Sequence, residues 1–213
     1  MLSNNKCKIY IENIKYLEDE KVYNDFYNCI SIERKKKIDA FKFEKDKKLS
    51  LLAEVLLKKG LNDRNIDINN CDFLYGDNGK PYIKNQKIFF NISHSGEYAM
   101  CAFADIEIGC DIEKIKDIDL NIEKRFFHHS EYENIMAQKT DLLKKDLFFR
   151  YWVLKESFMK VTGFGMSLPL DSFEIIIENN NIQVSQNINK DTYIFEELSG
   201  IVGYKASVCI KNN

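Results

Sequence analysis

The stretch Asn91–Ile115, NISHSGEYAMCAFADIEIGCDIEKI, carries the strongest pattern in the chain. Two apolar runs flank a turn signal at Ser95-Gly96, and a third run, IGCDIE, follows them. Side chains alternate along an extended segment, so Asp111 and Glu113 lie on one side of the third strand. The apolar residues between and before them face the other side. This stretch therefore predicts three strands, the last of which presents two carboxylates together.

The two carboxylates of this strand predict either a metal site or an ordinary exposed edge. Neighbouring acids repel each other unless a positive group lies between them. Oxygen ligands without a Cys–His set favour Mg²⁺ or Mn²⁺ over zinc. An edge strand that exposes two acids to solvent is the alternative, and the DIE motif alone leaves both open. His94, at the end of a strand between two serines, is either a donor to a phosphate or a structural hydrogen-bonding residue.

The stretch Phe148–Phe173, FFRYWVLKESFMKVTGFGMSLPLDSF, predicts a helix that carries acidic and basic groups together. Trp152, Glu156 and Lys160 fall at i, i+4 and i+8 and therefore share one face, with Lys155 one step round. A Glu–Lys pair at this spacing is also common on plain surface helices. The combination suits a site in which the acid binds a metal and the lysines bind phosphate oxygens.

The remaining elements follow one order twice, helices and then strands. This repetition predicts an α+β protein built as a pseudo-dimer of two similar halves, residues 1–108 and 109–213. The expected helices are 19–29, 32–41, 44–59, 122–127, 130–138 and 142–161, with Ser130 as a cap and Glu133 completing a capping box. The other expected strands are CKIYIENI, CDFLY, KPYI, KIFFNIS and YAMCAFA in the first half and SFEIIIENNNIQVS, TYIFEEL and YKASVCIK in the second.

Composition limits the classes of protein to which the chain can belong. It has 213 residues and a formal net charge of −2, enough for one large domain or two small ones. No apolar run is long enough to span a bilayer, and the first residues lack the pattern of a secretory signal. The six scattered cysteines form no CxxC motif, which favours reduced thiols in a cytoplasmic protein.

The charges are distributed unevenly along the chain. Lys and Arg outnumber Asp and Glu between Ser31 and Gly60, whereas acids predominate between Asp105 and Glu133. The first region suits an anion and the second a cation, although two solvated helical faces would show the same distribution. Nucleic acid binding is not expected, because the basic segment is short and no recognition motif accompanies it.

Several motifs, in their order along the chain, resemble the Sfp-type 4′-phosphopantetheinyl transferases. They are GKP at 79–81, NISHS at 91–95, GCDIE at 109–113, KRFFHHSEY at 124–132, WVLKESFMKVTG at 152–163 and LPLDSF at 168–173. The resemblance covers nearly the whole chain, from Ser31 to Lys205. It implies transfer of the 4′-phosphopantetheine group from coenzyme A to a serine of an acyl or peptidyl carrier protein, with release of 3′,5′-ADP. It also implies a site in the cleft between the two halves.

The resemblance implies a set of site residues as well. The Mg²⁺ ligands, with Mn²⁺ as the alternative ion, would be Asp111, Glu113 and Glu156. The residues that bind the remaining parts of coenzyme A would be Lys155, Lys160, Ser93 and His94 at the pyrophosphate, Lys80 near the nucleotide, and Arg34, Lys37 and Ser50 at the 3′-phosphate. The first half would thus hold the nucleotide end and the second half the metal and the pyrophosphate.

In the implied reaction the carrier serine attacks the β-phosphate of coenzyme A. Glu156, itself or through water, is the candidate general base, and Lys160 would stabilise charge on the pyrophosphate. The segment Lys116–Phe127 is expected to contact the carrier, although Phe126 and Phe127 suit core packing equally well. Because one chain holds both halves, a monomer is expected.

Two other functions compete with transfer. A protein that binds coenzyme A without transferring its arm is the main alternative, although all three acids and Lys160 are present. A generic Mg²⁺-nucleotide enzyme has no support, because no GxxxxGK[ST] loop occurs.

Overall fold

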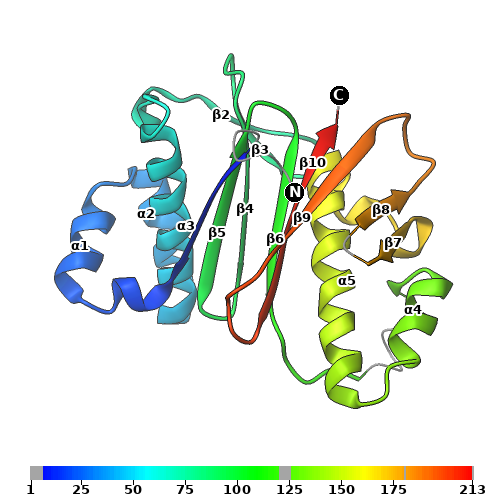
Figure 1. Ribbon diagram of the computed structural model, residues 1–213. Helices are drawn as coiled ribbons and strands as arrows, with labels where there is room; N and C mark the ends of the chain where they lie inside the picture. Colours follow the sequence, from blue (N-terminus) through cyan, green and yellow to red (C-terminus); the bar gives the residue numbers. More distant parts are fainter. Residues whose placement is uncertain (1–6, 120–125, 180, 213) are drawn as a thin grey trace.

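The computed structural model describes residues 7–119, 126–179 and 181–212, and in it two three-stranded sheets stand between two groups of helices (Figure 1). Both of these sheets are antiparallel, with strand orders β1-β5-β4 and β6-β10-β9. The first half contains β1 (Cys7–Asn13), α1 (Glu20–Asn28), α2 (Ile32–Asp39), α3 (Glu44–Asn62), β2 (Phe73–Tyr75), β3 (Pro81–Ile83), β4 (Phe89–Ser95) and β5 (Tyr98–Ala104). The second half contains β6 (Ile108–Lys114), α4 (His129–Met136), α5 (Asp141–Thr162), β7 (Glu174–Glu178), β8 (Asn181–Ser185), β9 (Thr192–Leu198) and β10 (Tyr204–Asn212).

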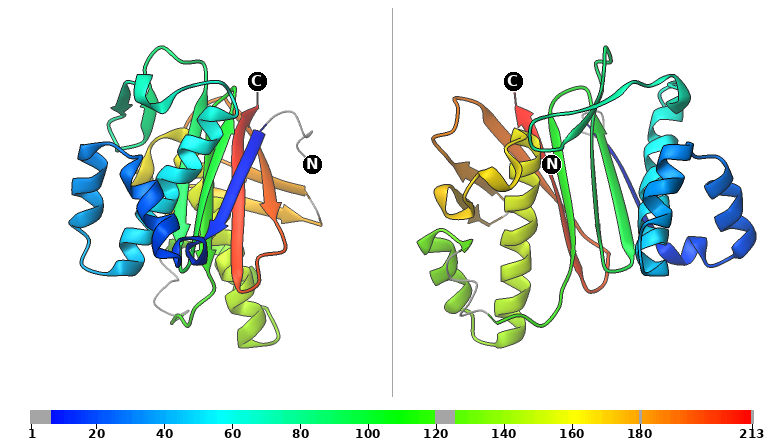
Figure 2. Two further views of the ribbon diagram at one scale, coloured as in Figure 1. Left: turned by 90° about the vertical axis from the view of Figure 1, so that its left-hand side faces the viewer. Right: turned by 180° about the vertical axis from the view of Figure 1, so that it is seen from behind.

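The two halves share one topology. Each begins with a strand, passes through helices that end in a long one, forms a small two-stranded sheet and closes with a hairpin. In both sheets the last strand of the half lies in the centre, between the first strand and its hairpin partner. The views from the side and from behind show α3 and α5 on opposite outer sides of the strands (Figure 2). The predicted α+β pseudo-dimer is confirmed.

Three hydrophobic clusters hold these layers together. In the first, Leu52 and Leu56 of α3 pack with Phe103 of the first sheet. In the second, α5 packs with the second sheet and β7 through Phe158 and its neighbours. The third cluster lies between the sheets and includes Ile112, whose side chain is fully buried. Full burial of such an aliphatic side chain stabilises the fold by roughly 1.5–3 kcal/mol relative to exposure. The strands of the two halves thus share one core.

The ends of α5 follow from local chemistry. At its start, the Thr140 hydroxyl accepts a hydrogen bond from the Leu143 amide at 3.3 Å, which satisfies one of the first free N–H groups. At its end, Gly163 has a φ of +77° and closes the last turn in the left-handed conformation that glycine tolerates best. The helix therefore runs the full length that the sequence predicts.

The start of α4 differs from its prediction. Ser130 does not cap α4: the N-cap is His128, whose amide donates to Glu131 Oε2 at 2.9 Å, so the prediction of Ser130 with Glu133 was wrong by two residues. Glu131 also accepts from the buried Ile175 amide, and this tertiary contact sets the start of the helix. The expected helix 122–127 lies largely outside the described residues.

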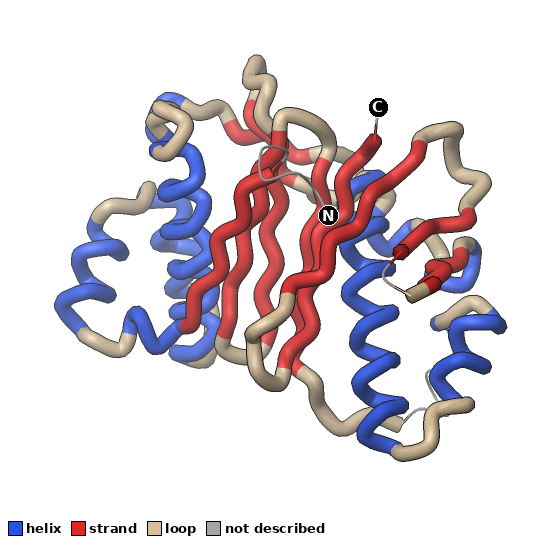
Figure 3. Tube along the Cα trace, in the orientation of Figure 1, coloured by secondary structure: helices blue, strands red, loops and turns tan. Residues whose placement is uncertain are grey.

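Other global predictions can be compared with the described residues. All six cysteines are free thiols there. None of the helices in the described parts of the chain combines the length and the apolar composition needed to cross a membrane. A tube view coloured by secondary structure shows that strands form the centre and helices the flanks (Figure 3).

Gly109 allows α5 to lie directly on β6. A Cβ atom at this position would lie 2.1 Å from the Ser157 carbonyl oxygen and 2.4 Å from the Val161 amide nitrogen. These are backbone atoms of a helix, so they cannot move aside as a side chain would. The glycine of the GCDIE motif therefore brings α5 and its side chains close to the acids of β6.

We expect Gly109→Ala to lower the free energy of unfolding by roughly 1–3 kcal/mol, because α5 must move away from β6. Urea denaturation measures this, with Gly76→Ala as the control, since the nearest atom to a Cβ at Gly76 lies 3.8 Å away. Equal stability of the two variants would contradict the close contact.

Candidate functional site

The side chain of Asp111 lies at the junction of the two halves and is nearly inaccessible, with 3% of its surface exposed. Its Oδ1 atom accepts from the Lys160 ammonium at 2.6 Å and from the Ser93 hydroxyl at 2.8 Å. Its Oδ2 atom is buried and has no hydrogen-bond partner among the described residues. A buried carboxylate oxygen without a partner is costly, so this atom marks a place for a further positive group.

Lys160 extends from the last turn of α5 to the acids of β6. Its ammonium also donates to the Ser93 hydroxyl at 3.2 Å. Loss of solvent lowers the pKa of Lys160, but the charge of Asp111, with Cys110 and Glu156, more than offsets this and leaves the pKa raised. Lys160 is therefore a cation at neutral pH and can bind either a carboxylate or a phosphate.

Glu113 and Glu156 lie close enough to Asp111 to be affected by its charge. Burial raises the pKa of Glu113 and of Glu156, and in both cases the negative charge of Asp111 raises it further. Lys160 opposes both shifts, and the Ser95 hydroxyl opposes the shift of Glu113. Lys160 thus acts on all three acids and Lys116 on Glu113, and the three carboxylates outnumber these two lysines.

The donor set fits a hard divalent cation. Carboxylate oxygens are the ligands that Mg²⁺ prefers, and Asp111 keeps one oxygen free for it. Among the described residues, no three acidic, histidine or cysteine side chains already converge closely enough to enclose an ion. The Lys160 ammonium instead lies against Asp111, so a bound cation would share that carboxylate with it.

One cavity lies beside Glu156, and a second cavity adjoins it. The first, about 310 Å³, is lined by the GKP motif, by Asn91 and by Glu156 and Lys160. The second, about 590 Å³, lies in the first half against α2 and α3. Pro81 and Ile92 line both, so the two spaces meet at these residues.

The second cavity contains the basic residues predicted from the sequence. The Arg34 guanidinium donates to the Ser50 hydroxyl and carbonyl, both at 3.3 Å, and forms an ion pair with Glu54 at 3.0 Å. The Lys37 ammonium lies 5.6 Å from the centre of the Tyr75 ring. The structure thus brings together Arg34, Lys37 and Ser50, and it adds Glu54, which the sequence analysis did not identify.

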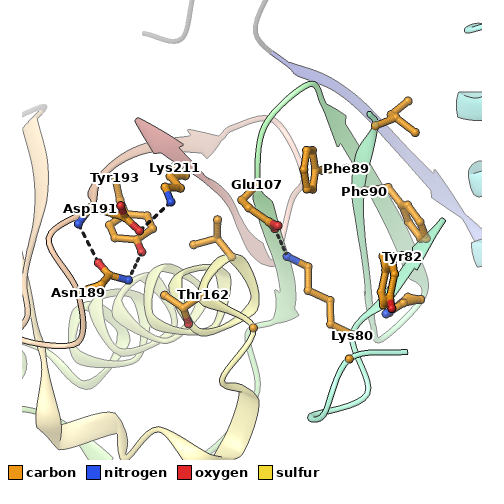
Figure 4. Close-up of a pocket in the computed structure, with 15 residues that line it drawn as sticks. Lys80, Tyr82, Phe89, Phe90, Glu107, Thr162, Asn189, Asp191, Tyr193 and Lys211 are labelled. Atoms are coloured by element: carbon orange, nitrogen blue, oxygen red, sulfur yellow. Dashed lines mark hydrogen bonds and ion pairs between the residues drawn. The ribbon is translucent and has the colours of Figure 1, made fainter. Parts of the chain in front are cut away.

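Lys80 lies between two cavities. It lines the first cavity and also a third, of about 330 Å³, on the other side. Figure 4 shows its side chain directed at Glu107, and the ion pair measures 3.1 Å. The Lys80 ammonium also donates to the Ile108 carbonyl at 3.0 Å. Lys80 therefore holds the start of β6 and borders the space beside Glu156.

His94 is exposed at the end of β4. Partial loss of solvent, and then the charge of Lys160, lower its pKa. A neutral imidazole near Lys160 can donate one hydrogen bond to a phosphate without adding charge.

The prediction that Lys155 binds the cofactor was wrong. Its side chain is buried and forms an ion pair with Glu131 at 2.8 Å. The ammonium also donates to the carbonyls of Leu170 and Phe173, each at 2.8 Å. All three N–H groups of the ammonium therefore have partners inside the second half. The matching acid in the sequence was Glu131 of the HHSEYE stretch, but spacing alone did not connect the two.

The segment predicted to contact a carrier is only partly described. Leu120, Lys124 and Arg125 lie outside the described residues. Phe127 is buried in the core of the second half, with 4% of its surface exposed, so core packing is the one of its two expected roles that the structure shows. Phe126 is exposed and packs edge-on against Trp152, and Lys116 is exposed.

Sequence comparisons agree with the motif resemblance. A family described as the 4′-phosphopantetheinyl transferase superfamily matches residues 107–209, and one described as 4′-phosphopantetheinyl transferase, N-terminal, matches residues 18–105. The chain is 36% identical to the 4′-phosphopantetheinyl transferase Sfp of Bacillus subtilis (strain 168) over 187 residues, which is 86% of this chain and 83% of that protein. It is 34% identical to the 4′-phosphopantetheinyl transferase gsp of Aneurinibacillus migulanus, over 90% of this chain and 80% of that protein.

Among solved structures, a holo-(acyl-carrier-protein) synthase from Bacillus anthracis in complex with CoA (3′,5′-ADP) aligns with 51% of this chain and 97% of that chain, at 17% identity and a TM-score of 0.40. The two family matches together span most of the chain, and the identity to Sfp extends over both halves. The chain belongs to the 4′-phosphopantetheinyl transferase superfamily.

Proposed function

We propose that this chain transfers the 4′-phosphopantetheine group from coenzyme A to a serine of an acyl or peptidyl carrier protein, in the presence of Mg²⁺. The observation that carries the proposal is the buried Asp111 carboxylate, one oxygen of which has no hydrogen-bond partner within the described residues, beside Glu113, Glu156 and Lys160. The membership of the chain in the transferase family supports the same reaction.

In this proposal each half, residues 1–108 and residues 109–213, binds a different part of the substrate. Arg34 and Lys37, in the cavity of the first half, would bind the 3′-phosphate of coenzyme A, with Ser50 orienting Arg34. Lys80, Ser93 and His94 would lie along the phosphates between that cavity and the acids. Both halves come from one chain, so the proposed site needs no second copy.

The acids of the second half would bind the cation. Asp111, Glu113 and Glu156 supply the carboxylates, and a bound Mg²⁺ would neutralise charge on the pyrophosphate and orient it for transfer. When the pyrophosphate enters, the Lys160 ammonium can donate to its oxygens as well as to Asp111. A phosphoryl transfer of this kind depends mainly on such positioning and charge neutralisation.

The bond changes require one proton acceptor. The carrier serine oxygen forms a bond to the β-phosphorus, and the bond from that phosphorus to the bridging oxygen breaks, so 3′,5′-ADP leaves. The serine proton passes to a base, and Glu156 is the candidate. Glu156 lines the cavity beside Lys160, which gives its carboxylate access to a substrate bound there.

The carrier would approach near the described ends of the segment Lys116–Phe127. Lys116 and Phe126 are exposed there, and carriers with acidic surfaces suit a basic and aromatic contact.

Incubation of an apo carrier protein with this chain, coenzyme A and Mg²⁺ tests the reaction. We expect mass spectrometry to show one phosphopantetheine added to one serine, and EDTA to abolish the addition. Coenzyme A binding without any mass gain, across several acyl and peptidyl carriers, would favour the binding-protein alternative.

Glu156→Gln removes the proposed base but keeps the size and most hydrogen bonds of the side chain. We expect kcat at saturating Mg²⁺ to fall by about 10²-fold or more. Glu133→Gln, an exposed change on α4, is the control. Full turnover of Glu156→Gln at saturating Mg²⁺ would show that the base lies elsewhere.

Arg34→Ala tests the 3′-phosphate assignment. A lost charge-assisted hydrogen bond of about 1.5 kcal/mol or more corresponds to about a tenfold rise in KM for coenzyme A. Dephospho-coenzyme A, which lacks the 3′-phosphate, should bind the variant and the parent equally. Lys36 is an exposed lysine of the same helix and does not line the cavity, so Lys36→Ala should change neither the KM for coenzyme A nor the binding of dephospho-coenzyme A. The assignment is wrong if Arg34→Ala weakens both substrates alike.

A further inference from the structure

The two sheets meet where β4 and β6 run beside each other, and side chains make the connection. Each strand is an edge of its own three-stranded sheet. Among the described residues, three side-chain oxygens of β4, from Asn91, Ser93 and Ser95, accept the backbone N–H groups of β6. The accepted amides belong to Cys110, Ile112 and Lys114, at 2.8, 3.4 and 3.1 Å respectively. Side-chain oxygens of alternate β4 residues thus accept the hydrogen bonds that backbone carbonyl groups accept in a regular sheet.

The two serines do more than join the strands. The Ser93 hydroxyl accepts from the Ile112 amide and donates to Asp111 Oδ1 at 2.8 Å. The Ser95 hydroxyl accepts from the Lys114 amide and donates to Glu113 Oε2 at 2.6 Å. The same arrangement therefore occurs twice. In each case a serine of β4 binds one acid of β6 and the amide of the next residue, and the second case lies two residues further along both strands.

This geometry fixes the direction of each hydroxyl proton. A serine hydroxyl has one proton to donate, and its oxygen already accepts a hydrogen bond from an amide of β6. The proton therefore goes to the neighbouring carboxylate, and the carboxylate is held relative to the backbone of its own strand. Asp111 has Lys160 as a second donor, whereas Glu113 has no other side-chain hydrogen bond or ion pair within residues 7–119, 126–179 and 181–212.

We propose that Ser95 is a positioning residue that holds the Glu113 carboxylate in place to bind the metal ion. This inference rests on the proposed metal site of Asp111, Glu113 and Glu156. Without Ser95, a glutamate at the end of a strand is free to rotate into solvent, and the ion loses one preset ligand. Hydrogen bonds that orient metal ligands commonly change metal affinity by about 10–100-fold.

The competing explanation is that Ser95 only joins the two halves. A purely structural serine would change stability and leave metal affinity unaltered. Ser207 offers a control for the loss of a structural hydroxyl, because it contacts the Val153 carbonyl at 2.7 Å and the Ser157 hydroxyl at 3.0 Å, both in α5, and makes no hydrogen bond to the three acids.

The test is a titration with Mn²⁺, followed by electron paramagnetic resonance, in the presence of coenzyme A and without any carrier. We expect Ser95→Ala to weaken Mn²⁺ binding by about tenfold or more. Ser95→Thr, which keeps the hydroxyl, and Ser207→Ala should remain within about threefold of the parent chain. In turnover, Ser95→Ala should need more Mg²⁺ for half-maximal rate, with KM for coenzyme A unchanged and kcat recovered at saturating Mg²⁺.

A double-mutant comparison shows whether Ser95 acts through Glu113. Once Glu113→Gln is present, adding Ser95→Ala should cause little further loss of Mn²⁺ affinity. If Ser95→Ala does not fold, Ser95→Cys takes its place, because a thiol is a weaker donor and should also weaken Mn²⁺ binding. Unchanged Mn²⁺ affinity in the folded variant, or additive losses in the double variant, would overturn the inference.

The failure of this inference differs from the failure of the proposed reaction. A parent chain that binds Mn²⁺ but adds no mass to any carrier would overturn the transfer, while the Mn²⁺ titrations would still decide the role of Ser95. A parent chain that transfers the arm, with Ser95→Ala equal to it in Mn²⁺ affinity, would overturn the role of Ser95 alone.

Discussion

The burial of the Asp111 carboxylate at the junction of the halves constrains the strands and the helix that pack around it. A charge removed from water is stable only when nearby groups compensate it. The acid belongs to β6, and two other elements supply its partners: β4 supplies Ser93 and α5 supplies Lys160. The close approach of α5 to β6 at Gly109 makes the last of these contacts possible. The same arrangement leaves Asp111 Oδ2 without a hydrogen-bond partner in the described parts of the chain, and the proposed cation would bind there.

The two halves have the same topology, but the charged side chains that they place near their junction have opposite signs. In the first half, α2 and α3 line a cavity with Arg34 and Lys37, which suits a phosphate. In the second half, β6 and α5 present acids, which suit a metal ion. A molecule that carries a phosphate at one end and a pyrophosphate further along matches this division. Two halves of one topology thus carry different side chains where they meet, and under the proposed function each half would bind a different part of coenzyme A.

Neighbouring polar residues of α5 point to different surroundings. Glu156 and Lys160 face the acids, whereas Lys155, one residue away, turns into the core and pairs with Glu131. This second buried pair ties α5 to α4 and to the start of β7 through the Ile175 amide. Removing one partner of such a pair would leave an uncompensated buried charge, so it maintains the helix that carries the site.

The sequence by itself determined the elements and the face on which each acid lies. Alternation placed Asp111 and Glu113 together on a strand, and helical spacing placed Glu156 and Lys160 together on α5, because both periods are properties of the local backbone. The repeated order of helices and strands was enough to predict two α+β halves. Only the tertiary structure decided that Lys155 and Phe127 are buried, that Glu54 pairs with Arg34, and that Ser95 holds Glu113. Those facts depend on which residue lies opposite across a junction between distant segments, and local periodicity contains no information about that partner.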